Sequence, residues 1–169
     1  MRKFLYVLGA LAVILLLFVS IKYLTVKSID ESKLDYIQTE KSVGLKRVKQ
    51  NGKWALLDES NRPITDFEYD YISDFSNDKS EILKNDKYGF IDKNANVIVE
   101  PKYDLVFGFN NGVAKVLLNG KYGVVDENGV EIIKPDYYDY ISEFDYRGLA
   151  KASKGDKTVI IDKSGKVQK

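Results

Sequence analysis

Two residue types are absent from this 169-residue chain, cysteine and histidine. Without cysteine the chain cannot build a disulfide framework, and it cannot carry a lipoprotein anchor on a lipidated cysteine. Without either residue, the Ser-His and Cys-His nucleophile pairs and the usual zinc ligand sets are excluded. The chain also lacks an excess of charge of either sign, because it has 26 basic and 25 acidic residues and a net charge of +1. A near-neutral chain offers no electrostatic footprint for nucleic acid.

Motifs for phosphate, metal or cofactor binding are equally scarce. No glycine-rich phosphate loop occurs, since Gly120-Lys121 is followed by Tyr122 rather than by serine or threonine. The carboxylates Asp66, Glu68 and Asp70 are of the type that hydrolyses glycosidic bonds or binds calcium. They alternate with aromatic residues, however, and that pattern is more typical of the wet face of a half-buried strand. The sequence therefore predicts no catalytic residue, no metal site, no cofactor and no enzyme.

A fixed internal repeat dominates the rest of the chain. The stretch Lys121–Asp126 (KYGVVD) repeats Lys87–Asp92 (KYGFID) and Lys53–Asp58 (KWALLD) at a period of 34 residues, and Lys157–Asp162 is a looser fourth copy. Such a period is the signature of a repeat architecture. The structural positions that this register predicts are Trp54, Tyr88 and Tyr122; Ala55, Gly89 and Gly123; Asp58, Asp92 and Asp126; and Tyr69, Tyr103 and Tyr137.

Turn residues predict what each unit folds into. Asn51-Gly52 and Asn119-Gly120 lie between apolar or alternating runs, and Asn-Gly is the strongest short-range signal for a β-hairpin. A second turn follows each recurring aspartate, as in Asp126–Gly129, where glycine takes the left-handed position. In the second unit Ala95 stands in place of that glycine, so we expect Asn94 to carry the turn. We therefore predict an all-β fold, an array of about three and a half 34-residue antiparallel β-hairpin repeats with three short strands per unit.

The middle strand of each unit is apolar on both faces. In the second unit Tyr88 and Phe90 point one way, while Gly89 and Ile91 point the other. A strand of this kind is covered on both sides, which favours a core shared between stacked units over a row of ligand-binding aromatic residues. The recurring small residue predicts a close approach of another side chain or backbone at that position. Whether the array is an open solenoid or closes like a propeller is left open.

The N-terminus carries a second signal. Arg2 and Lys3 precede an uncharged, mostly apolar run, Phe4–Ile21, which would extend about 27 Å as a helix. A cleavable signal peptide usually has a shorter apolar region and a small-x-small site, and the nearest candidate here is Val26-Lys-Ser28. We expect an uncleaved signal anchor with a cytoplasmic N-terminus, with cleavage and secretion, or a buried helix, as the alternatives.

These observations predict the domain organisation. The expected segments are 1–3, a cytoplasmic tip; 4–24, a transmembrane signal anchor; 25–42, a polar tether; and 43–169, the repeat domain, with units 43–77, 78–111, 112–147 and 148–169. The repeats would then lie outside a single-pass cell-membrane anchor, or in the medium if the signal is cleaved.

The repeated residues resemble the WG-repeat (KWG-repeat) family, over about Val43 to Lys169. Its unit runs roughly as Lys-Trp-Gly-Tyr-Ile-Asp followed by an Ile-Pro-x-Tyr-Asp segment and a closing phenylalanine. This chain departs from the pattern, since Trp54 is followed by Ala55, and Gly89 and Gly123 are preceded by tyrosine. The resemblance implies antiparallel β-hairpin arrays in bacterial proteins, often with an export signal, and no common enzymatic activity.

For function, the sequence favours a non-catalytic, membrane-anchored binding module outside the cytoplasm. Its partner would be a protein or a cell-wall glycan, because tyrosines beside acids offer both flat apolar area and polar tips. The alternatives are a structural spacer, a subunit of a membrane complex and, least favoured, an enzyme. Residues that the period does not require form the expected binding surface: Tyr71, Asp136, Tyr138, Asp139 and Tyr140.

Overall fold

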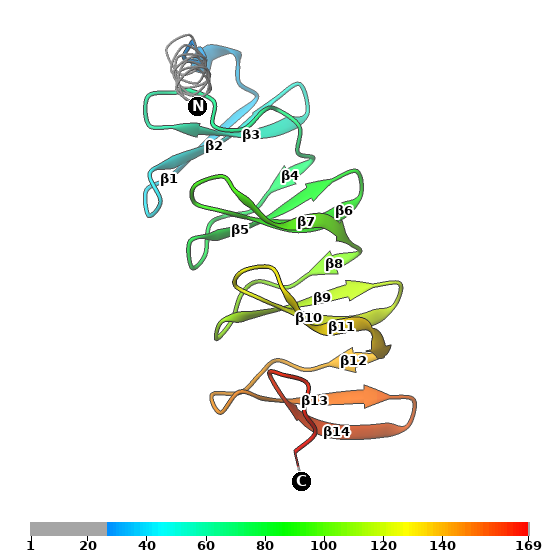
Figure 1. Ribbon diagram of the computed structural model, residues 1–169. Helices are drawn as coiled ribbons and strands as arrows, with labels where there is room; N and C mark the ends of the chain where they lie inside the picture. Colours follow the sequence, from blue (N-terminus) through cyan, green and yellow to red (C-terminus); the bar gives the residue numbers. More distant parts are fainter. Residues whose placement is uncertain (1–26, 169) are drawn as a thin grey trace, which may run out of the picture.

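The computed structural model of the protein describes residues 27–168. They form four antiparallel sheets stacked in chain order, the first and the last at opposite ends of an open array (Figure 1). The strands of the first sheet are β1 (Tyr36–Glu40), β2 (Leu45–Gln50) and β3 (Lys53–Asp58), and those of the second are β4 (Tyr71–Ile72), β5 (Lys79–Lys84), β6 (Lys87–Asp92) and β7 (Val97–Tyr103). The third sheet holds β8 (Leu105–Val106), β9 (Val113–Leu118), β10 (Lys121–Asp126) and β11 (Glu131–Tyr138), and the fourth holds β12 (Tyr140–Ile141), β13 (Leu149–Lys154) and β14 (Lys157–Asp162).

The predicted all-β array of antiparallel hairpins is confirmed. Each sheet is built around one hairpin, namely β2–β3, β5–β6, β9–β10 and β13–β14. The only helical segment in residues 27–168 is the short 3-10 helix η1 (Glu31–Lys33). In this part of the chain no helix is long and apolar enough to cross a membrane. The expected anchor, 4–24, lies outside the described residues.

The hairpin turns have the predicted backbone. Asn51 and Gly52 both have positive φ (51° and 79°), as a type I′ turn requires at two successive positions. The expectation that Asn94 would replace Ala95 in the second turn is wrong, because Ala95 itself has φ 63°. The Asp92 carboxylate accepts hydrogen bonds from the backbone N–H of Asn94 and Asn96 (both 2.8 Å), which fixes the turn and leaves the left-handed position to Ala95. That conformation costs about 1–2 kcal/mol for a non-glycine residue.

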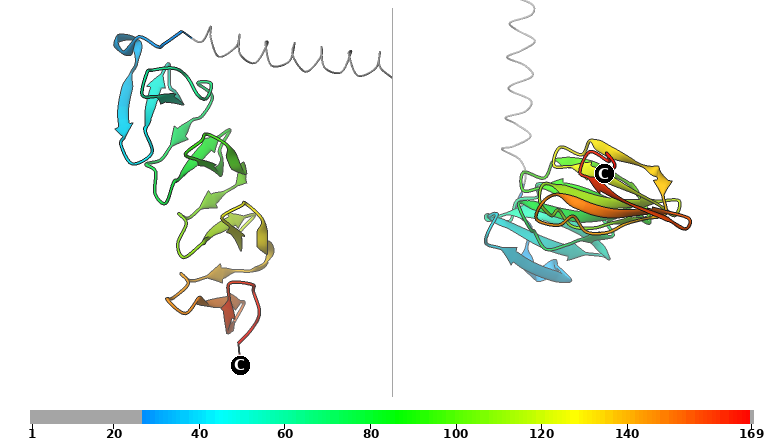
Figure 2. Two further views of the ribbon diagram at one scale, coloured as in Figure 1. Left: turned by 60° about the vertical axis from the view of Figure 1, so that its left-hand side comes forward. Right: turned by 90° about the horizontal axis from the view of Figure 1, so that it is seen from below.

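Adjacent sheets interlock through their first strands. β4, β8 and β12 pair with the hairpin that follows them, although each lies in the segment that ends the preceding sequence repeat. Each 34-residue unit therefore contributes to two sheets. The successive sheets lie over one another when the stack is seen along its length (Figure 2).

The segment 25–42 is not a plain tether, which corrects the sequence-based expectation. Tyr36–Glu40 forms β1 and pairs with β2, with Ile37 opposite Val48. Ile29 and Leu34 pack against the outer face of the first sheet, where Val48, Ala55 and Leu57 are buried. The physical reason is that the later sheets take their first strand from the end of the preceding unit, whereas among residues 27–168 the first sheet has no unit before it, so the residues before β2 provide both the edge strand and the cover.

Apolar clusters between successive sheets confirm the predicted shared core. The first and second sheets enclose a cluster around Leu56 and Ile82, the second and third one around Phe90 and Val116, and the third and fourth one around Val124 and Ile161. Burial of both faces of each middle strand explains why those strands lack the polar alternation of a strand that is wet on one side.

Charged side chains also cross from sheet to sheet. Arg47, Glu81, Lys115 and Lys151 occupy the same position in the four sheets. Arg47 is buried and donates to the Ile72 carbonyl of the second sheet (2.8 Å). Lys115 is buried and donates to the Ile141 carbonyl of the fourth sheet (3.3 Å). Glu81 is half buried, and its burial raises the pKa of its carboxyl group.

The recurring small residue marks a close approach inside one sheet. A Cβ added at Gly89 would lie 2.2 Å from the Val99 carbonyl oxygen, and one added at Gly123 would lie 2.6 Å from the Ile133 carbonyl oxygen. Both contacts come from the last strand of the same sheet, β7 or β11, which shifts register opposite the glycine. In the first sheet, where only isolated bridges replace that strand, Ala55 fits.

Candidate functional site

The structure separates the residues of the expected binding surface into two places. Tyr71 lies at the start of the second sheet, and its ring packs against Trp54 of the first (centroids 5.9 Å apart). Tyr138, Asp139 and Tyr140 lie where the third sheet passes into the fourth. The five residues therefore do not form a single surface.

The last tyrosine of the repeat is Tyr138, and the prediction of Tyr137 at that position was wrong. Tyr138 pairs with Tyr122 as Tyr103 pairs with Tyr88 and as Tyr69 pairs with Trp54. The residue inserted in the third unit therefore lies before Tyr138 and not after it. Tyr137 is consequently the extra aromatic residue, and half of its surface is exposed (50%).

Asp139 is likewise structural, since it belongs to a lysine–aspartate pair that recurs in each of three units. In each pair the lysine that begins the middle strand bonds the aspartate that precedes the next sheet, and the aspartate also accepts a backbone N–H from the following hairpin turn. The pairs are Lys53–Asp70, Lys87–Asp104 and Lys121–Asp139, with turn donors Asn85, Asn119 and Gly155. Both hydrogen bonds hold the pKa of each carboxyl group below its usual value. The bond from lysine contributes most, and the bond from the backbone N–H contributes next.

A groove of about 600 Å³ surrounds the exposed Tyr137. It is lined by Lys121, Tyr137, Tyr138, Asp139, Ala152, Lys154, Gly155, Lys157, Val159 and Val167. The Lys154 Nζ lies 3.6 Å from the centre of the Tyr137 ring, a cation–π contact. The groove thus combines a free aromatic ring with three lysines and one carboxylate. We call it the Tyr137 groove.

A second groove, of about 610 Å³, lies between the first two sheets. Its lining residues are Asp35, Tyr36, Arg47, Lys49, Gly52, Trp54, Tyr71 and Asp74. The Trp54 ring is flanked by Tyr36 (centroids 5.1 Å apart) and Tyr71, and both tyrosines remain exposed (43% and 42%). Tyr71 was expected on a surface and is exposed, and Trp54 was expected at a structural position and packs against the core between the first two sheets while it also lines the groove. Sequence reasoning left Tyr36 in the tether. We call this the Trp54 groove.

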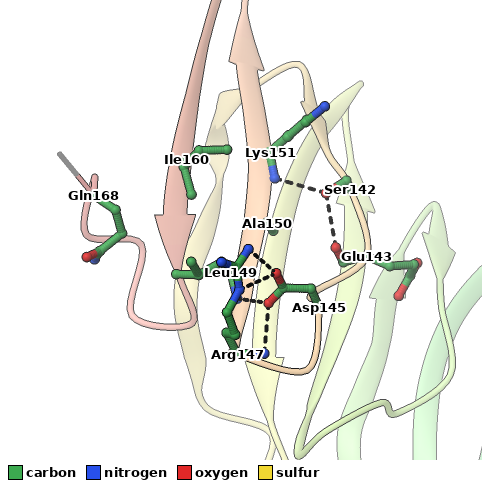
Figure 3. Close-up of a pocket in the computed structure, with 9 residues that line it drawn as sticks. All are labelled: Ser142, Glu143, Asp145, Arg147, Leu149, Ala150, Lys151, Ile160 and Gln168. Carbon is green, nitrogen blue, oxygen red and sulfur yellow. Dashed lines mark hydrogen bonds and ion pairs between the residues drawn. The ribbon is translucent and has the colours of Figure 1, made fainter.

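A third hollow, of about 640 Å³, lies on the outer face of the fourth sheet (Figure 3). Its apolar floor is Leu149 and Ile160, which correspond to Val113 and Val124 of the preceding sheet. At its rim the Asp145 carboxylate accepts bonds from the backbone N–H groups of Leu149 (3.0 Å) and Arg147 (2.9 Å) and from the Arg147 side chain. The Leu149 bond contributes most to lowering the pKa of Asp145. This hollow is the face that a further sheet would cover in the interior of the stack.

Metal chemistry finds no support in the described residues. Between residues 27 and 168 no three acidic side chains converge as a metal ion would require. Asp136 is exposed beside Tyr137 in β11, and the acids Asp58, Asp92 and Asp126 each bond their own turns. The Tyr137 and Trp54 grooves are lined by aromatic rings and charged side chains.

A family model described as a WG containing repeat matches three consecutive stretches of the chain, residues 55–88, 88–122 and 122–157. Together these stretches span more than half of the sequence. The comparison with curated proteins returned no match.

Several solved structures align with the chain at low similarity. A structure of S. cerevisiae Dbp5 bound to Nup159 and Gle1 contains a chain that is 15% identical, with a TM-score of 0.41 over 77% of this chain and 44% of that one. The N-terminal domain of Nup159 is 9% identical, with a TM-score of 0.40 over 80% and 43%. The extracellular domain of a one-component system from B. thetaiotaomicron is 13% identical, with a TM-score of 0.35 over 80% and 24%. The chain thus aligns with less than half the length of each.

Proposed function

The chain belongs to the family of WG containing repeats, and from that premise we propose that it is a non-catalytic binding module held at the outer face of a cell membrane. The observation that carries the proposal is the Tyr137 groove. Tyr137 is an insertion that the repeat does not need, yet its ring is held half exposed under Lys154 at the edge of a groove large enough for a ligand. Exposed aromatic residues that the core does not require favour recognition, since a tyrosine ring supplies apolar area and a polar tip at low entropic cost.

The composition of the groove indicates what it would bind. Lys154 and Lys157 are exposed, and Lys121 is already paired with Asp139. A partner that presents an acidic or hydrogen-bonding group beside an apolar surface would match the two free ammonium groups and the tyrosine ring. A protein surface meets this requirement, and so does an acidic cell-wall polymer.

The proposed location rests on the sequence alone. The apolar run Phe4–Ile21, flanked by Arg2 and Lys3, has the length and charge of a signal anchor whose N-terminus stays in the cytoplasm. The described part of the chain begins only a few residues after this run and continues directly into the first sheet. The stack of sheets would therefore lie close to the outer face of the membrane that holds the anchor.

Replacement of Tyr137 by alanine should reduce partner capture several-fold while lowering the melting temperature by no more than a few degrees. An amine-reactive cross-linker applied to intact cells would join the partner to Lys154 or Lys157, and mass spectrometry would identify and quantify it. Tyr146→Ala is the matched control, because Tyr146 is even more exposed (92%) but lies outside the groove. If Tyr137→Ala captures as much partner as the wild type, the groove is not the binding site. If the wild-type chain captures nothing, a spacer role takes the place of the binding module.

Protease added to intact cells stripped of their wall should remove the repeat domain and leave a membrane-bound N-terminal fragment. Immunoblots with antibodies against the repeats would measure the loss, with a cytoplasmic protein as the control for cell integrity. Full protection of the repeats would contradict the proposed orientation. A soluble product that begins near Ile29 would show that the segment is cleaved and is not an anchor.

A further inference from the structure

The Trp54 groove contains an aromatic cluster in which Trp54 packs on the core, whereas the two tyrosines beside it are not required by the fold. Tyr36, Tyr71, Leu105 and Tyr140 occupy the same position in the first strands of the four sheets. Because Leu105 occupies this position in the third sheet, the stacked fold accepts an aliphatic side chain there and does not need an aromatic one. Trp54, the only tryptophan of the chain, lies between two of these tyrosines, one from its own sheet and one from the next. Three aromatic rings from β1, β3 and β4 thus meet at one open groove.

One carboxylate of this groove differs from its structural equivalents. Asp35 precedes β1 as Asp70, Asp104 and Asp139 precede the first strands of the later sheets. The three later aspartates are each paired with a lysine, whereas Asp35 has no ion pair among the described residues. Its recorded contact is a long one, in which the Gly52 N–H lies 3.5 Å from a carboxylate oxygen. Asp35 therefore presents acceptor oxygens at the rim of the groove.

A buried arginine fixes a second carboxylate of the groove, Asp74. Arg47 donates to Glu40 (2.6 Å) and to the Ile72 carbonyl (2.8 Å), and its remaining nitrogen is paired with Asp74. The Asp74 side chain is otherwise exposed (84%), so it has a fixed position and acceptor capacity to spare. Lys49 lies on the same face, with its Nζ 5.9 Å from the centre of the Trp54 ring, and supplies donors. Two acids and two bases leave the groove without net charge.

We propose that the Trp54 groove binds a neutral glycan. The apolar face of a pyranose ring would lie on the aromatic cluster, while its hydroxyl groups would donate to Asp35 and Asp74 and accept from Lys49. Aromatic lining with a few placed polar groups is the usual composition of a small-ligand site. A proline-rich peptide is the other ligand of aromatic grooves, but its carbonyls only accept hydrogen bonds, so it would desolvate Asp35 without offering it a donor and would leave the spare acceptor oxygen of Asp74 unused. This proposal deepens the binding role proposed above by naming a ligand class, although it concerns a groove separate from that of Tyr137.

Tryptophan fluorescence tests the proposal directly, because Trp54 is the sole tryptophan. The full chain, kept in a detergent without a sugar headgroup, would be titrated with cellotriose, maltotriose and triacetylchitotriose, and with decaproline as the peptide probe. We expect a saturable change in emission with at least one of the three sugars at millimolar concentration, and none with decaproline. Calorimetry at the same concentrations would confirm that the change reports binding.

Tyr71→Leu is the decisive variant, because the third sheet already carries leucine at the equivalent position and the fold is preserved. It should weaken sugar binding at least tenfold, and Asp35→Asn should weaken it several-fold. Tyr140→Leu is the matched control, since Tyr140 is similarly exposed and its ring also packs on an aromatic neighbour (Tyr122), and it should bind like the wild type.

Three results would overturn the proposal: no saturable response to any sugar, an equal response in Tyr71→Leu, or a response to decaproline alone, which would make the groove a peptide site. Because Tyr71→Leu leaves the Tyr137 groove intact, cross-linking through Lys154 in this variant shows separately whether the proposed function survives.

Discussion

Gly89→Ala is expected to destabilise the protein by about 3 kcal/mol, although it adds a single methyl group. The added Cβ would lie 2.2 Å from the Val99 carbonyl oxygen and 2.8 Å from the Pro101 nitrogen, and both are backbone atoms that cannot rotate away. Overpacking usually costs about 1–3 kcal/mol, and the forced movement of β7 away from β6 places this change at the upper end. Urea titration of the variant and the wild type measures the difference.

Gly108→Ala provides the matched control for this prediction. Gly108 lies in the exposed segment between β8 and β9, and an added Cβ there meets only a Glu81 carboxylate oxygen at 3.8 Å, which is an ordinary contact. This variant should stay within about 0.5 kcal/mol of the wild type, as exposed substitutions usually do. Small and equal losses of stability at the two glycines would mean that the β7 backbone moves aside at little cost and that position 89 tolerates a side chain.

Position 89 also illustrates what the sequence could and could not predict. The recurrence of Ala55, Gly89 and Gly123 at one register predicted a close contact, and that contact exists. Its origin was not visible, because the contact depends on a register shift of the last strand of the sheet, β7, and a shift leaves no periodic signal. The period itself was sufficient for the fold class, since stacked units share their cores and repeat their apolar residues.

One signal in the sequence would have predicted β1. The triplet Asp-Tyr-Ile occurs at Asp35–Ile37 and recurs at Asp70–Ile72 and Asp139–Ile141, where it begins the first strand of a sheet. The first copy lies outside the 34-residue register of Lys53 and its equivalents, within a polar segment that reads as a linker. Its meaning appears only once the first strand of each sheet is seen to come from the end of the preceding unit.

The candidate site was harder to predict, because an insertion can be placed on either side of a repeated residue. Counting 34 residues from Tyr103 leads to Tyr137, whereas the recurring Lys–Asp pair leads to Tyr138. The lysine lies 17 residues before the aspartate in Lys87–Asp104 and 18 before it in Lys121–Asp139, so the extra residue falls within this interval. Pairing chemistry, and not distance along the chain, decides which tyrosine is structural.

This difference leads to opposite expectations for two tyrosines that are one period apart. Tyr103→Ala should destabilise the protein by about 3–5 kcal/mol, the usual cost of truncating a buried aromatic residue. Tyr103 is fully buried between the second and third sheets, and its hydroxyl donates to Glu131 of the third sheet (2.6 Å). Burial, and after it this hydrogen bond, raises the pKa of Tyr103, so the phenol stays protonated as a donor. Denaturant titration measures the loss, and Tyr103→Phe isolates the part due to the bond, about 1.5–3 kcal/mol for a bond to a charged group.

Tyr137→Ala, the substitution that simple counting would equate with Tyr103→Ala, should cost less than about 2 kcal/mol. Its ring is half exposed, and the substitution removes its cation–π contact with Lys154, worth about 0.5–1 kcal/mol at an exposed site, and its edge-on contact with Tyr138 (centroids 5.0 Å apart), worth about as much again. A loss at Tyr137 equal to that at Tyr103 would show that the inserted residue lies on the other side of the repeat and that Tyr137 belongs to the core. A large loss at Tyr103 with a small one at Tyr137 would leave Tyr137 free of any structural task, which is the condition for its use as a contact residue.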